Sequence, residues 1–354
     1  MLVIFLMTLT TIAFMISALL THYLSRPQAV IYIIDIPNSR SLHQHPTPMS
    51  GGIAVLVAFL LTGMVACSVL PSNEYILWIG GSVLGVATIS LLDDYRPVAA
   101  RYRLLVHFLA AFLLLFQTDL WIESINFANL QLSLPSFWQI LLSLLFVVWM
   151  INLYNFMDGM DGFAGGMAVS GFGSFALLGW FANDMSFAVL NLLIASAASG
   201  FLVFNFPPAR IFMGDVGSSS LGLLAAAFSL WGNQAGIFPL WIAMLLFSPF
   251  IVDATVTLLK RLQRGEKIWQ AHRTHYYQQL VQLGWGHKRT VLCEYGLMFA
   301  CALSAILANF LSYRMQIIIM LIWLSIYAIL MNAIDRLKSQ QTPRRVESNG
   351  GGPK

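Results

Sequence analysis

Long apolar runs without a single charge dominate this chain and restrict what it can fold into. The longest of them, residues 216–252, contains 37 residues with no Asp, Glu, Lys or Arg. An apolar stretch of about 20 residues is long enough to cross the hydrocarbon core of a bilayer as a helix. Only 10% of the chain is charged and 58% is hydrophobic, whereas a soluble domain carries about 25% charged residues. The sequence therefore predicts an all-α, polytopic membrane protein.

About eleven segments are predicted to span the membrane. The run 216–252 is too long for one helix, and Gly232-Asn233-Gln234 with Pro239 divides it into two. The predicted spans are 2–24, 52–70, 75–92, 102–118, 136–153, 163–182, 186–205, 217–232, 238–258, 294–312 and 315–334.

The basic residues predict the orientation of these spans. With eleven spans, the connecting segments alternate between two sides, and eighteen of the 19 Lys and Arg fall on one side. Only Arg314 falls on the other. The excess of Lys and Arg in cytoplasmic loops places the N-terminus outside and the C-terminus in the cytoplasm. Residues 1–339 are expected to form one transmembrane domain, and the polar stretch 340–354 a disordered cytoplasmic tail.

Five aspartates are expected to gather at the cytoplasmic ends of the spans. Asp93 and Asp94 stand in LLDDYRPVAARYR, Asp158 and Asp161 in NLYNFMDGMDG, and Asp215 in RIFMGDVGSSS. One Asp at a helix start is usually an N-cap, but paired acids on one face indicate more than capping. Mg²⁺ binds through one or two carboxylates together with substrate phosphates. The pattern favours a metal-assisted phosphate site.

Basic residues share that side of the membrane. Arg101 and Arg103 follow the first acidic pair, and AHRTHYYQQL contains His272, Arg273 and His275. A cluster of His and Arg facing acids is typical of a pyrophosphate clamp. For the neighbouring Lys260, Arg261 and Arg264, we prefer the simpler interpretation that they retain the loop on its side and contact anionic lipid.

These motifs together resemble one family. The segments SRSLHQHPTPMSGG, DDYRPVAARYR, NLYNFMDGMDGFAGG, PPARIFMGDVGSSSLG and AHRTHYYQQL occur in an order similar to that of polyprenyl-phosphate N-acetylhexosamine-1-phosphate transferases. The bacterial enzymes that initiate O-antigen synthesis show the strongest resemblance.

The resemblance implies a reaction, partners and a location. N-acetylhexosamine-1-phosphate would move from a UDP-sugar to undecaprenyl phosphate, with release of UMP and a requirement for Mg²⁺ or Mn²⁺. GlcNAc and 6-deoxy relatives such as FucNAc and QuiNAc are all open as the sugar. The enzyme would lie in the bacterial inner membrane among membrane lipids, act in cell-envelope polysaccharide synthesis and bind no nucleic acid. A homodimer is compatible with the sequence.

The resemblance also assigns residues. It implies that Asp161 and Asp215 are the metal ligands, and that Asp93 and Asp94 are the catalytic acids nearest the lipid phosphate. Phe212 would stack on uracil. The remaining assignments are substrate contacts at Arg101, Arg103, His272, Arg273 and His275, with Asn152, Asn155 and the catalytic Asp158 belonging to the same signature.

The chain departs from the family pattern at one place, and three alternative functions remain. Many relatives have Arg-Gly-Gly-Gly after Pro-Thr-Pro, where this chain has Met49-Ser50-Gly51-Gly52, so any contact of that arginine is lost. A muramoyl-pentapeptide transferase is disfavoured because a long His-rich loop is absent. A transporter would use acids within its spans, and Asp253 in the span 238–258 is the candidate. A purely structural role would make the aspartates dispensable.

Overall fold

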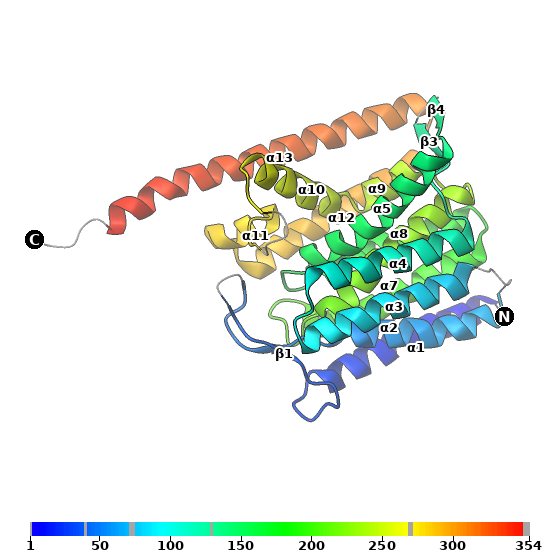
Figure 1. Cartoon of the computed structure of the whole chain (residues 1–354), viewed down its shortest axis with the longest axis horizontal. Helices are drawn as coiled ribbons and strands as arrows, with labels where there is room; N and C mark the ends of the chain where they lie inside the picture. Colours follow the sequence, from blue (N-terminus) through cyan, green and yellow to red (C-terminus); the bar gives the residue numbers. More distant parts are fainter. Residues whose placement is uncertain (1, 39–40, 71–74, 128–129, 268–271, 350–354) are drawn as a thin grey trace, which may run out of the picture.

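The computed structural model is a bundle of helices and describes residues 2–38, 41–70, 75–127, 130–267 and 272–349. Most helices lie roughly side by side (Figure 1). The helices are α1 (Leu2–Leu24), α2 (Gly51–Cys67), α3 (Tyr75–Tyr95), α4 (Ala100–Thr118), α5 (Ser136–Met157), α6 (Phe163–Phe181), α7 (Met185–Asn205), α8 (Gly214–Gln234), α9 (Leu240–Leu246), α10 (Ser248–Gln263), α11 (Tyr276–Leu280), α12 (Gly286–Asn309) and α13 (Tyr313–Asn349). A short π-helix, Val281–Trp285, joins α11 to α12.

Each predicted span overlaps a helix or, at 238–258, two consecutive helices, and the all-α polytopic fold is confirmed. Eight described helices are long and apolar enough to cross a membrane, and the bent pair α9 and α10 would be a ninth. The 17-residue α2 is short, and α8 begins with the polar sequence GDVGSSS. Both nevertheless lie among the other helices of the bundle (Figure 1). The side of the membrane that each end faces stays a prediction.

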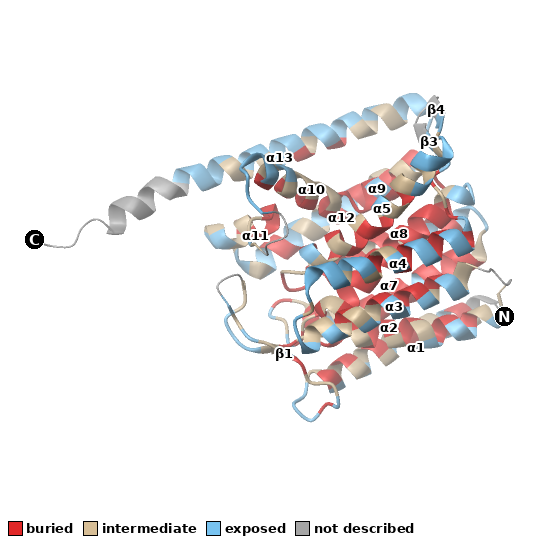
Figure 2. Cartoon of the chain, in the orientation of Figure 1, coloured by how far each residue is buried: buried red, intermediate tan, exposed pale blue. Residues whose placement is uncertain are grey.

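The centre of the bundle is α8. Its residues from Val216 to Gly232 are all buried, and it packs against α3 and α5. Small side chains allow this close packing: a methyl group at Gly222 would lie 2.5 Å from the backbone oxygen of Met150. Small residues serve this purpose where helices meet within a membrane. Figure 2 shows the buried centre and the exposed outer helices.

Two helices differ from the sequence-based expectation. The span predicted at 238–258 is bent by 82° between α9 and α10. Pro249 stands in the first turn of α10, where its ring cannot continue the hydrogen bonds of α9. The last helix, α13, runs through Asn349, beyond Gln340, where a disordered tail was predicted. Gln, Arg and Glu in that stretch are good helix formers.

Two small antiparallel pairs of strands lie in the loops. Strands β1 (Ile34–Asp35) and β2 (Thr47–Pro48) pair Ile34 with Pro48, and strands β3 (Ser124–Phe127) and β4 (Leu130–Ser133) form a hairpin. They lie at opposite ends of the bundle (Figure 1). The first pair folds the segment before α2 over the end where the aspartates gather.

Candidate active site

Five aspartates meet at one end of the bundle because two helices end there and two begin there. Asp93 and Asp94 lie in the last turn of α3, and Asp158 is the residue after α5. Asp161 follows in the turn before α6, and Asp215 lies in the first turn of α8. The backbone N–H of Asp215 donates to Asp94 Oδ1 at 3.2 Å. Segments more than 100 residues apart therefore share one acidic site, as the sequence predicted.

A cavity of about 180 Å³ opens between these segments. Its lining combines carboxylates with aromatic, amide and imidazole groups, which suits a phosphorylated ligand with a flat base. The lining residues are Asp35, Ser41, Leu42, His43, Met49, Asp158, Gly159, Met160, Asp161, Asn205, Phe212, Gly214, Asp215, Gln278 and His287.

Arg103 supplies the counter-charge for two of the helices. Its Nη1 donates to Asp93 Oδ2 and, at 3.3 Å, to Asp215 Oδ2. Asp93 Oδ1 also accepts the backbone N–H of Val98 at 2.6 Å. Charge-assisted bonds of this kind are about twice as strong as neutral ones. Arg103 therefore ties α4 to α3 and α8, and both oxygens of Asp93 are occupied.

The acidic cluster carries more negative charge than Arg103 can balance. Burial raises the pKa of Asp158 well above its usual range, and the carboxylates of Asp215, Asp94 and Asp161 raise it further. Each carboxylate disfavours ionisation of its neighbours, since like charges close together repel. A bound cation would remove this penalty.

The geometry at Gly214 fits such a cation. Asp94 Oδ2 is buried and has no hydrogen-bond partner among the described residues. A methyl group at Gly214 would lie 3.0 Å from this oxygen, and Gly214 has φ +74°, which favours glycine. No three His, Cys, Asp or Glu side chains of the described chain form a complete metal site. Mg²⁺ needs only one or two carboxylates when substrate phosphates complete its shell.

Asp161, the other predicted metal ligand, contacts two neighbouring segments. Its Oδ2 accepts the backbone N–H of Ala209 at 3.0 Å, and its Oδ1 lies 3.0 Å from His287 Nδ1. The same turn is fixed by Asn205, whose Oδ1 accepts the N–H of Gly162 at 2.9 Å. His287 stands at the start of α12 and was not predicted as a site residue.

The segment before α2 forms another wall that the sequence analysis did not assign. The ring of His43 meets Phe212 edge-on, with centroids 4.9 Å apart, and His43 Nε2 lies 3.7 Å from Asp35 Oδ2. Burial raises the pKa of Asp35, while His43 opposes that rise. The backbone of Phe212 is bonded to Pro48 and Gly51. Phe212 thus lies at the cavity, and its stacking on a base stays a prediction.

The departure at Met49-Ser50 falls within this wall. Met49 lines the cavity, and its backbone N–H donates to Ile33 O at 2.9 Å. Ser50 is buried and precedes α2. An arginine in the place of Met49 would therefore begin at the cavity, and this chain presents a thioether there instead.

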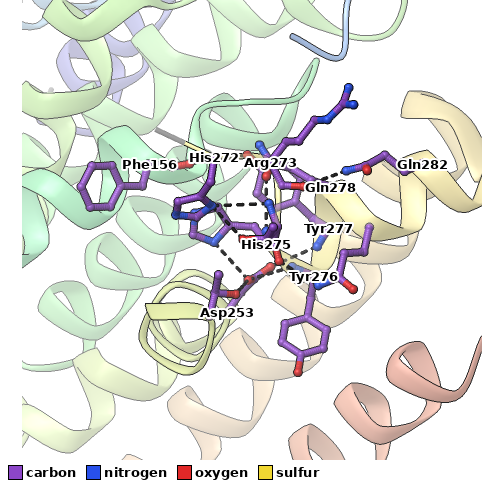
Figure 3. Close-up of polar contacts among 12 residues, drawn as sticks. Phe156, Asp253, His272, Arg273, His275, Tyr276, Tyr277, Gln278 and Gln282 are labelled. Carbon is purple, nitrogen blue, oxygen red and sulfur yellow. Dashed lines mark hydrogen bonds and ion pairs between the residues drawn. The ribbon is translucent and has the colours of Figure 1, made fainter. Parts of the chain in front are cut away.

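The His and Arg residues before α11 lie beside the cavity rather than in its lining. His275 is buried, and its Nδ1 lies 3.2 Å from Asp253 Oδ1. The two Asp253 oxygens accept the N–H groups of Tyr276 at 2.9 Å and Tyr277 at 3.0 Å, and Thr257 donates at 3.0 Å. Figure 3 shows Asp253 beneath the start of α11. Asp253 therefore anchors this helix, which argues against an ion-relay role.

His272 and Arg273 precede that anchor. His272 Nδ1 lies 2.9 Å from Thr274 Oγ1, and burial, followed by His275 and Arg261, lowers the pKa of His272 to about 4. Its imidazole is therefore neutral at pH 7. Arg273 is exposed, and its side chain extends away from Asp253 (Figure 3). Contact of these residues with a pyrophosphate stays a prediction.

The remaining predicted residues lie at varying distances from the cavity. Arg101 is exposed and stacks on Tyr102, 4.9 Å from the ring centroid. Asn155 donates to Ser218 Oγ at 3.0 Å and so joins α5 to α8. Asn152 donates to the backbone of Val148 at 2.7 Å. Neither asparagine belongs to the cavity lining.

Comparison with known proteins finds sequences similar to this chain. A sequence model described as glycosyl transferase family 4 matches residues 75–233, a range that includes all five aspartates but not His272–His275. A decaprenyl-phosphate N-acetylglucosaminephosphotransferase of Mycobacterium leprae (strain TN) is 30% identical over 341 residues, covering 86% of this chain and 83% of that protein. A probable undecaprenyl-phosphate N-acetylglucosaminyl 1-phosphate transferase of Bacillus subtilis (strain 168) is 26% identical over 325 residues, covering 90% and 87%. A phospho-N-acetylmuramoyl-pentapeptide-transferase of Listeria monocytogenes serotype 4b (strain F2365) is 28% identical over 271 residues, covering 71% and 80%.

Proposed function

This chain belongs to the polyprenyl-phosphate N-acetylhexosamine-1-phosphate transferases of glycosyl transferase family 4, and from that premise we propose its substrates. It is an enzyme that transfers an N-acetylhexosamine 1-phosphate to a polyprenyl phosphate. We propose a UDP-sugar as donor, carrying GlcNAc or a 6-deoxy relative such as FucNAc or QuiNAc. The proposed acceptor is undecaprenyl phosphate, and UMP is released.

The observation that carries the proposal is the acidic cavity at the end of the bundle. Its aspartates lie at helix ends rather than at mid-span. A soluble dianionic donor and a lipid phosphate can meet only where the membrane ends. A transporter site, in contrast, would lie near the bilayer midplane.

We propose Mg²⁺, or Mn²⁺, as the cofactor, with Asp215 and Asp161 as its protein ligands. When bound, the ion would offset the charge of the pyrophosphate. The chain itself contributes Phe212, which faces the cavity for the base. Arg103 keeps Asp93 and Asp215 in place. Phosphoryl transfer depends mainly on such positioning and charge balance.

Direct attack is the proposed order of chemistry. An oxygen of the lipid phosphate attacks the sugar-bearing phosphorus, the bond from that phosphorus to the UMP oxygen breaks, and UMP leaves with the electron pair. A phosphate monoester has a second pKa of about 6, so the acceptor is mostly dianionic at pH 7 and needs no strong base. Between the two candidate acids, Asp94 is the one with an unpartnered oxygen among the described residues. We assign it to position the acceptor.

The proposed setting is the inner membrane of a bacterium. There the product would initiate O-antigen or another cell-envelope polysaccharide. The proposal includes assembly as a homodimer, which the reaction itself does not require.

Purified enzyme with undecaprenyl phosphate and a panel of UDP-sugars tests the function. The panel contains UDP-GlcNAc, UDP-QuiNAc, UDP-FucNAc and UDP-MurNAc-pentapeptide. The expected result is release of UMP with one of the first three, and a lipid product of matching mass. UMP release with the pentapeptide donor alone would reassign the enzyme to the muramoyl type, and no release with any donor would contradict the proposal.

Isotope exchange tests the order of chemistry. Enzyme, Mg²⁺, UDP-sugar and labelled UMP are incubated after removal of polyprenyl phosphate, which mass spectrometry verifies. Direct attack predicts no label in the UDP-sugar. Exchange without lipid that disappears in Asp94→Asn or Asp93→Asn would instead identify a phospho-enzyme with that carboxylate as nucleophile.

A further inference from the structure

A second polar cavity lies apart from the aspartates. It measures about 360 Å³ and lies between the end of α10, the start of α11 and α13. Its lining includes the cations Lys260, Arg261, Arg264 and Lys338, together with Tyr276 and Asp335. It shares no lining residue with the acidic cavity.

The charges around this cavity are predominantly positive. Lys260 Nζ lies 2.6 Å from Asp335 Oδ2, and Arg261 Nε donates to Glu266 at 2.7 Å. Arg264 Nη1 also lies 4.0 Å from Glu266 Oε1, so the four lining cations outnumber these two acids. The lining also contains the hydroxyl groups of Thr257, Thr274 and Ser339, of which Thr257 donates to Asp253 and Ser339 to the backbone of Arg336. This composition suits the oxygens of a phosphate group.

The cavity also adjoins apolar surface. It lies where the apolar stretch of α13, Tyr313–Gln340, ends. Next to its cations in the chain, Leu259 is 52%, Leu262 60% and Leu337 41% exposed. A ligand that fits both surfaces is an amphiphile with an anionic head. Basic pockets between membrane helices bind the headgroups of anionic lipids in this manner.

We propose that this cavity binds the headgroup phosphate of an anionic phospholipid, whose acyl chains lie along Leu259, Leu262 and Leu337. This lipid is neither donor nor acceptor. The hydroxyl of Tyr276 contacts Lys260 and lies 3.3 Å from Asp335, and its backbone N–H is held by Asp253. A headgroup in the cavity therefore lies against Tyr276, the first residue of α11.

Lipid binding to the full chain in neutral detergent micelles tests the proposal. Arg264 and Lys338 are exposed and belong to opposite walls, so the variant Arg264→Gln/Lys338→Gln is expected to fold. Binding of phosphatidylglycerol, followed by native mass spectrometry, should weaken by about tenfold or more. The matched control Lys288→Gln/Arg289→Gln removes two exposed charges outside this cavity and should change binding by less than about twofold.

Each alternative has its own result. Equal binding of phosphatidylcholine, or equal loss in the control variant, would reduce the site to non-specific attraction and overturn the proposal. Displacement of phosphatidylglycerol by millimolar inorganic phosphate would make it a site for free anions. Displacement by an equimolar amount of undecaprenyl phosphate, with the same dependence on Arg264 and Lys338, would assign it to the acceptor. No UDP-sugar is present, so failure here leaves the proposed reaction untouched.

Discussion

Asp215 illustrates how one side chain can be tested for a structural and a catalytic role. It lies in the first turn of α8, but the residue that caps this helix is Met213, and no side-chain cap is formed. Its carboxylate instead meets Arg103 at 3.3 Å. The N-cap interpretation is therefore disfavoured, and a role at the cavity remains.

The first prediction is that Asp215→Asn abolishes turnover without unfolding the enzyme. A neutral amide is a poorer Mg²⁺ ligand than a carboxylate, and loss of several kcal/mol of charge stabilisation slows a reaction by at least about 100-fold. The measurements are UMP release and Mn²⁺ binding by electron paramagnetic resonance, beside the thermal midpoint. Unchanged turnover and unchanged Mn²⁺ binding would remove Asp215 from the metal site.

The second prediction concerns Arg103. Arg103→Gln leaves Asp93 and Asp215 without their shared counter-charge, and should cost about 1–2 kcal/mol of stability after allowance for its partial exposure. Turnover should fall as well. Arg101→Gln is the matched control, because Arg101 is exposed and stacks on Tyr102. Equal losses of stability in both variants would contradict the bridging role of Arg103.

At the residue scale, the sequence predicted acids better than their partners. Four of the five aspartates stand in pairs, and Asp158, Asp161 and Asp215 each stand next to a glycine, so their gathering at one end could be inferred from the sequence. His287 and His43 are single residues without such spacing, and only the fold brings them to the cavity. Asp253 was considered as an ion-relay residue because an acid within a span is costly. Its observed role is to anchor α11, and no sequence pattern predicted that α11 would lie next to it.

The contact between α2 and α8 depends on two glycines. A methyl group on Gly52 would lie 2.3 Å from Gly217 Cα, and the N–H of Gly52 donates to Met213 O at 2.7 Å. The third prediction is that Gly52→Ala separates these helices, costs about 1–3 kcal/mol and lowers turnover by shifting Asp215. Gly81→Ala is the control, because its methyl group would meet nothing within 4 Å. The thermal midpoints of both variants test this; equal midpoints would show that the contact is not tight.

The fourth prediction concerns the anchoring of α11. Asp253→Asn retains an acceptor but loses the charge that holds His275 and the start of α11. If His272 and Arg273 contact the donor, the KM for UDP-sugar should rise about tenfold, since hydrogen bonds to charged groups contribute roughly 1.5–3 kcal/mol. Thr257→Val removes one neutral donor to the same carboxylate and should change KM less. A lower kcat at constant KM would contradict a positioning role.

The positions of the helices could be predicted from the sequence, whereas the bend between α9 and α10 and the end of α13 could not. Each apolar run corresponds to a helix because burial in lipid requires every backbone group to be paired within the segment. The 82° bend between α9 and α10 depends on Pro249, which the pattern placed inside a continuous span. The extent of α13 differs because a polar sequence can still favour a helix.

The fifth prediction concerns the whole molecule and its orientation. A reporter fused after Lys338 should be cytoplasmic, and a cysteine at Asn183, between α6 and α7, should react with an impermeant thiol reagent from outside. Both follow from the excess of Lys and Arg on one side. Labelling of the two positions from the same side would show that the alternation of spans is wrong.

The pairing of Arg103 with Asp93 also has a consequence for biogenesis. These residues are ten positions apart, so their ion pair can form as soon as α4 follows α3 into the membrane. Asp158, Asp161 and Asp215 are synthesised later, and His287 later still. A nascent chain thus neutralises the first aspartate of the cluster locally, and it completes the reaction centre only after most of its length has left the ribosome.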